Sequence, residues 1–85
     1  MKSFMYTIID PLGIHARPAG QIVNEAKKYS STIMIDAGEK QANATRLMAV
    51  MTLGIKCGQS VTITAEGDDE DAAIAAMQQF FEQNL

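Results

Sequence analysis

The sequence predicts an α+β fold: an open-faced sandwich in which a four-stranded antiparallel sheet carries three helices on one face. Apolar residues alternate with polar ones in four short segments and recur at helical spacing in three others, in the order β-α-β-β-α-β-α. The strands alternate and each helix has an apolar side, and one sheet covered on one face buries these sides. The 85 residues, of which 47% are hydrophobic, suit a single domain over residues 1–85.

The first strand is predicted by Phe4, Tyr6 and Ile8, which alternate with Met5 and Thr7. A turn follows at residues 10–13, where the sequence reads Asp-Pro-Leu-Gly.

The first helix follows this turn and is about three turns long. Pro18 suits its first turn, where a missing N–H costs nothing, and Lys27 and Lys28 suit its last turn, where cations favour the helix dipole. Its buried stripe consists of Ala19, Ile22, Val23 and Ala26.

A hairpin and a short helix are expected next. Residues 32–36 predict a strand, residues 37–39 a turn, and residues 40–44 a return strand. Residues 47–53 are apolar on too many sides for a simple surface helix, so we expect a short helix with part of its apolar surface exposed. Gly54 is expected to end it.

The last strand and last helix have the clearest patterns. Val61, Ile63 and Ala65 alternate with polar residues. Gly67–Asp69 offers a turn and an N-cap for the final helix, and two further acids, Glu70 and Asp71, suit its first turn. The buried stripe of this helix consists of Ile74, Met77 and Phe81.

Composition excludes several functions. The net charge is −3, divided between +3 over residues 1–56 and −6 over residues 57–85. There is no concentrated basic stripe and only 6% aromatic residues, so nucleic acid is a poor partner. No apolar run is long enough for membrane insertion. A single histidine excludes a multi-histidine metal site, and the single cysteine, Cys57, favours a reducing, cytoplasmic compartment.

His15 is the main candidate for chemistry. It lies between a glycine turn and a helix that begins with Ala16, Arg17 and Pro18. The free N–H groups of a helix N-terminus suit a phosphate, and an arginine can donate to two phosphate oxygens at once. Imidazole is also an adequate nucleophile at neutral pH. The alternative is that His15 is only a capping residue and Arg17 a solvated surface charge.

Two other segments have competing interpretations. The run Leu47–Met51 is expected to be half core and half docking surface, because methionine recurs at adaptable binding surfaces. The acidic cluster over residues 66–71 lacks the spacing of a calcium loop, so we attribute it to helix capping and solubility. Cys57 has no catalytic partner in the sequence and is interpreted as an incidental thiol.

Two motifs then resemble those of a known family. Residues 13–19, Gly-Ile-His-Ala-Arg-Pro-Ala, resemble the phosphorylation-site motif of HPr, the histidine-containing phosphocarrier of the bacterial phosphoenolpyruvate-dependent sugar phosphotransferase system. Residues 47–55 resemble its second signature region. The length and the order of elements are similar from end to end.

The resemblance implies a stoichiometric phosphocarrier rather than an enzyme. His15 would accept a phosphoryl group on Nδ1 from phosphorylated Enzyme I and pass it to Enzyme IIA domains of sugar transporters, with no cofactor. Arg17 and the N–H groups of Ala16 and Arg17 would hold the phosphoryl oxygens. The partners would dock a monomer on two helices, at Ala16, Gly20, Gln21, Asn24 and Lys27 and at Leu47, Met48, Met51 and Thr52.

Two residues depart from the family pattern. Arg46 occupies the position of a regulatory serine that a kinase phosphorylates in some members, which puts that switch in doubt. Thr45 is displaced from it by one residue. Gly20 stands where a small residue with a Cβ is usual; it would either loosen the helix or admit the backbone of a partner. Two alternatives remain open: a regulatory docking module of the HPr type, and a carrier in a nitrogen-related phosphotransfer chain.

Overall fold

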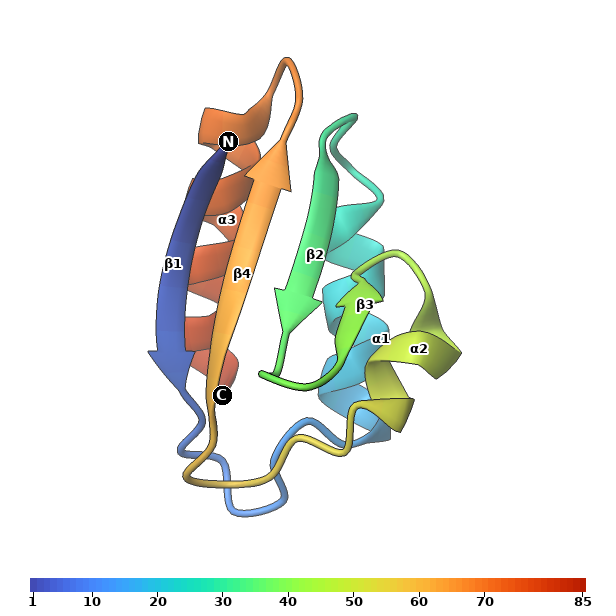
Figure 1. The fold of residues 1–85 in the computed structure, drawn as a ribbon, viewed down its shortest axis with the longest axis vertical. Coiled ribbons are helices and arrows are strands. Elements are labelled where there is room, and N and C mark those ends of the chain that lie inside the picture. The colour runs from blue at the N-terminus through green and yellow to red at the C-terminus, as the bar shows by residue number, and fades with distance from the viewer.

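The computed structural model describes all 85 residues and has the element order that the sequence predicts (Figure 1). The strands are β1 (Lys2–Thr7), β2 (Thr32–Asp36), β3 (Gln41–Asn43) and β4 (Ser60–Glu66). The helices are α1 (Ala16–Ala26), α2 (Leu47–Thr52) and α3 (Glu70–Asn84). None of the three helices combines the length and the apolar content that a bilayer span requires.

The four strands form one antiparallel sheet in the order β1-β4-β2-β3. Phe4 pairs with Ile63, Ile63 with Ile35, and Ile35 with Ala42, so one row of apolar side chains crosses the whole sheet on one face. The alternation in the sequence therefore sets the register, because a slip of one residue would turn each strand's apolar side chains to the opposite face.

Helices α1 and α3 cover this apolar face, and the other face of the sheet is uncovered (Figure 1). Phe81 of α3 is fully buried, and its ring lies edge-on to Phe4 and Tyr6 with centroids 5.8 Å apart in both pairs. Helix α2 packs beside α1 and next to the edge strand β3. The predicted fold class is confirmed.

Four element boundaries differ from the sequence-based expectation. Strand β1 ends at Thr7, so Ile8, expected within the strand, lies just beyond it and is buried. Helix α1 ends at Ala26, so Lys27 is its C-cap residue and Lys28 lies beyond the last turn. Strand β3 has three residues, because the side-chain oxygen of Asn43 accepts hydrogen bonds from the Thr45 N–H and hydroxyl and turns the chain away from the sheet. Helix α2 ends one residue early, at Thr52, before Gly54, which has a φ of +64°.

Asp69 occupies the predicted N-cap position of α3, but its carboxylate does not cap that helix. It accepts hydrogen bonds from the N–H groups of Ser30 and Ser31, each at 2.9 Å, and from the Ser31 hydroxyl. The attribution of this carboxylate to capping and solubility is therefore wrong: it ties the start of α3 to the loop before β2. The Ser31 hydroxyl and these N–H groups lower the pKa of Asp69.

Candidate functional site

His15 lies immediately before α1, in the N-cap position, with extended backbone angles and a half-buried side chain. Its side chain makes no capping hydrogen bond. His15 thus occupies the N-cap position that the capping alternative expects, but its side chain does not cap the helix, and neither ring nitrogen has a hydrogen-bond partner.

The turn before His15 is held by short-range hydrogen bonds. The Asp10 carboxylate accepts from the Leu12 N–H at 2.8 Å, and the Asp10 carbonyl accepts from the Gly13 N–H at 2.9 Å. Gly13 has a φ of +66°, and any Cβ at this position would collide with the Ile55 carbonyl oxygen. The Ile14 N–H donates to that same oxygen at 3.0 Å. The site therefore begins on a segment fixed against the loop that follows α2.

The first turn of α1 leaves two N–H groups free beside the imidazole. The first intrahelical bond runs from the Ala19 N–H to the His15 carbonyl at 3.0 Å, and the N–H groups of Ala16 and Arg17 have no protein acceptor. Pro18 has no N–H to satisfy. No acidic residue lies in this first turn, so the partial positive charge of the helix end is not neutralised from within the helix.

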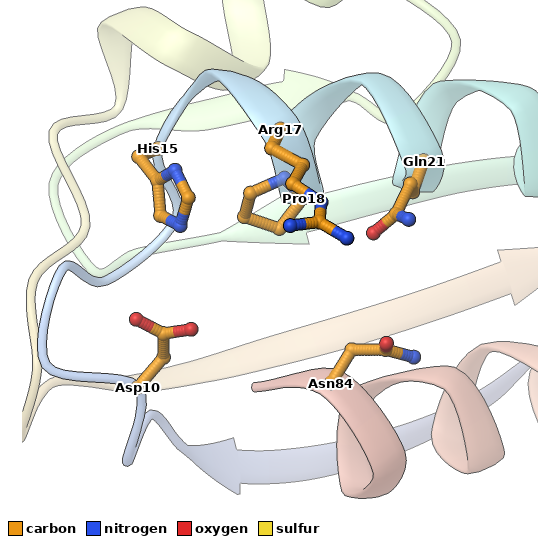
Figure 2. A pocket seen from close by; sticks show the side chains of 6 residues that line it. All are labelled: Asp10, His15, Arg17, Pro18, Gln21 and Asn84. Atoms are coloured by element: carbon orange, nitrogen blue, oxygen red, sulfur yellow. The ribbon is translucent and has the colours of Figure 1, made fainter.

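A polar cleft of about 210 Å³ opens between the start of α1 and the end of α3, and His15 forms part of its wall. Figure 2 shows the side chains of Arg17 and Gln21 reaching from α1 into this space, opposite Asn84 of α3 and Asp10 of the turn. The cleft is lined by Asp10, His15, Arg17, Pro18, Gln21 and Asn84.

Arg17 is exposed and forms neither a hydrogen bond nor an ion pair through its guanidinium. Its donors are thus free for an anion in the cleft. An imidazole, two free N–H groups and an unpaired guanidinium form a set that can hold a dianionic group on a ring nitrogen.

Asp10 and Asn84 are site residues that the sequence analysis missed. The N–H groups of Ile9 and Asp10 both donate to the main-chain oxygen of Leu85, at 2.7 and 2.8 Å. These two bonds bring the end of α3 against the turn and so bring Asn84 to the cleft. The only local signal was the turn at Asp10, which does not indicate what the carboxylate faces.

The expected docking residues lie on neighbouring helices, since α1 and α2 contact each other. On α2, Met48 is 69% exposed, Leu47 42% and Met51 38%, whereas Val50 is buried and Ala49 half-buried. The expected partial exposure of this apolar run is confirmed, with one residue of the five fully buried, and its docking role stays a prediction. The residues expected on or beside α1 are exposed except Gly20, which is half-buried, and they comprise Ala16, Gly20, Gln21, Asn24 and Lys27.

The fold is a small α+β domain with a polar cleft beside a histidine at a helix N-terminus. The family model described as the PTS HPr component phosphorylation site matches residues 2–83. The chain belongs to this family, the phosphocarriers of the phosphotransferase system.

Individual proteins of this family are similar to this chain over nearly its whole length. The phosphocarrier protein HPr of Lysinibacillus sphaericus is 47% identical over 77 residues, which cover 91% of this chain and 88% of that protein. The solved structure of the histidine-containing phosphocarrier protein of Mycoplasma is 45% identical with a TM-score of 0.94, over 96% of this chain and 93% of that one.

Some similar structures are dimers. An HPr dimer from Thermoanaerobacter tengcongensis matches with a TM-score of 0.77 and 41% identity, over 98% of this chain and 95% of that one. A monomer remains a prediction for this chain.

Proposed function

We propose that this chain accepts a phosphoryl group on Nδ1 of His15 from phosphorylated Enzyme I, and passes it to Enzyme IIA domains of sugar transporters. The observation that carries the proposal is the free His15 imidazole, beside the free N–H groups of α1 and the unpaired Arg17, within the residues that match the family.

The chemistry is a displacement at phosphorus. The lone pair of Nδ1 of His15 attacks the phosphorus while the bond between phosphorus and the donor atom of Enzyme I breaks. The N–H groups of Ala16 and Arg17 and the Arg17 guanidinium then hold the phosphoryl oxygens. In the onward transfer, a histidine of an Enzyme IIA domain attacks the phosphorus and the bond between phosphorus and Nδ1 of His15 breaks, which regenerates the free imidazole without any cofactor.

The surface around His15 supports docking of both donor and acceptor. The cleft is open and mostly polar, so it is accessible to a phosphoryl donor or acceptor. The exposed side chains of Leu47, Met48 and Met51 lie on the helix that contacts α1. Residues 1–56 carry a net charge of +3, which complements an acidic partner surface.

Transfer of a phosphoryl group tests the proposal directly. The chain is incubated with phosphoenolpyruvate, Mg²⁺ and purified Enzyme I, and intact mass is expected to show one added phosphate. Because His15 is the only histidine, an acid-labile, alkali-stable phosphate that is absent in His15→Ala identifies the site. Circular dichroism of His15→Ala controls for folding.

Failure with Enzyme I from several sources would contradict the proposal and favour the regulatory docking module. Transfer from Enzyme I onward to a nitrogen-related acceptor, and not to Enzyme IIA domains of sugar transporters, would instead favour the nitrogen-related chain.

A further inference from the structure

Asp10 is the only carboxylate side chain among the residues that line the His15 cleft. It is half-buried, and Figure 2 shows its carboxylate facing the cleft from the side opposite His15 and Arg17. Nothing in the proposed transfer step uses this group.

The position of Asp10 is fixed by four hydrogen bonds. Its N–H donates to the main-chain oxygen of Leu85, and its carbonyl accepts from Gly13. The Leu85 oxygen also accepts from the N–H of Ile9, the preceding residue. One carboxylate oxygen, Oδ1, accepts from the Leu12 N–H at 2.8 Å. The carboxylate is thus held at the cleft wall rather than free to turn away into solvent.

The negative charge of Asp10 has no ion-pair partner, since its carboxylate takes part in none of the three ion pairs of the structure. A phosphoryl group on His15 would bring close to two further negative charges into the same cleft. Arg17 supplies one positive charge there, so the phosphorylated cleft would carry an excess of negative charge.

We propose that the Asp10 carboxylate destabilises the phosphorylated form of His15 by like-charge repulsion and so favours donation of the phosphoryl group. Asp10 acts through its charge and does not bind the reacting atoms. This inference rests on the proposed function, because it concerns the same phosphoryl group.

Asp10→Asn isolates the charge, because the amide oxygen of asparagine still accepts from the Leu12 N–H. Asp36→Asn is a matched control: Asp36 Oδ1 accepts from the Gly38 N–H at 2.8 Å in the same type of turn, and Asp36 does not line the cleft. Asp10→Glu keeps the charge while lengthening the side chain. Thermal melting of all three variants checks that they fold.

The experiment measures how one phosphoryl pool divides between two carriers. Equal amounts of ¹⁵N-labelled wild type and unlabelled Asp10→Asn are mixed with catalytic Enzyme I, Mg²⁺ and half an equivalent of phosphoenolpyruvate. Enzyme I exchanges the phosphoryl group reversibly until equilibrium, and intact mass resolves the labelled from the unlabelled protein. We expect the ratio of phosphorylated to unphosphorylated protein to be roughly three- to tenfold higher for Asp10→Asn than for wild type, as for one charge near a protein surface.

The controls separate charge from structure. Asp36→Asn and Asp10→Glu are expected to share the phosphate with wild type within about twofold, and the preference for Asp10→Asn is expected to shrink in 1 M salt. An equal division with Asp10→Asn, a preference that salt leaves unchanged, or a preference that Asp10→Glu shares would each overturn the inference. If the wild type itself takes no phosphate from Enzyme I, the proposed function fails instead.

Discussion

Gly20 lies in the interior of α1. If it loosens the helix, replacing it with alanine should raise the stability of the protein, which can be measured. A Cβ at this position would meet no heavy atom within 4 Å. Glycine in a helix interior costs about 0.5–1 kcal/mol relative to alanine, because the unfolded chain loses more backbone freedom. We therefore expect Gly20→Ala to raise the free energy of unfolding by about 0.5–1 kcal/mol.

The corresponding change in melting temperature follows from the size of the chain. Unfolding entropy is about 2.1 cal/mol/K per residue, or about 0.18 kcal/mol/K for 85 residues. Gly20→Ala should thus raise Tm by about 3–6 °C, measured by circular dichroism at 222 nm. Gly38→Ala is the matched control: a Cβ there also meets nothing, but φ is +95°, so this variant is expected to melt below wild type.

A Tm for Gly20→Ala that is unchanged or lower would refute the reasoning, because it would mean that the helix interior does not penalise this glycine. The kinetics of phosphotransfer from Enzyme I then test the docking interpretation separately. A rise in KM beside the rise in Tm would place Gly20 against a partner's backbone. An unchanged KM would remove it from the docking surface.

Three further predictions follow from charge and packing. Arg46→Glu should weaken binding to Enzyme I at least severalfold by calorimetry, because the exposed N-cap of α2 changes by two charges; unchanged affinity would contradict this. The lowered pKa of Asp69 means that its stabilising contribution is present above pH 4 and is lost as pH falls through its folded pKa. Urea denaturation should therefore show Asp69→Asn less stable than wild type at pH 7, with the difference shrinking as the pH falls below 4 and through the folded pKa. Phe81→Ala should cost about 3–5 kcal/mol of unfolding free energy, since the ring is fully buried against Phe4 and Tyr6; a loss below about 1 kcal/mol would be inconsistent with this packing.

The sequence predicts the fold well because the burial of one side of each strand or helix makes apolar residues recur at a regular spacing in the sequence. Residues that alternate in the chain, such as Val61, Ile63 and Ala65, are the ones that β4 buries. Boundaries are less predictable, because they depend on single side chains. Asn43 ends β3 by accepting two hydrogen bonds from Thr45, and no periodicity contains that information.

The site divides in the same way between local and long-range features. His15 and Arg17 belong to one short motif at a helix start, so sequence reasoning finds both. Asn84 reaches the cleft only because main-chain N–H groups of the first turn bind the end of α3. No residue type or spacing near Asn84 indicates this neighbour, since the contact depends on how α1 and α3 pack.

Two aspartates show why the position of a side chain is easier to predict than its partner. Both lie where an aspartate is favoured, Asp10 in a turn and Asp69 before a helix. Asp10 accepts from a local N–H, as the turn predicts. Asp69 instead accepts from Ser31, 38 residues away, because the packing of α3 brings that loop within reach. Aspartate favours these positions because of the local backbone conformation, so its position can be predicted from the sequence. The tertiary structure determines which N–H group the carboxylate binds and which charges lie near it.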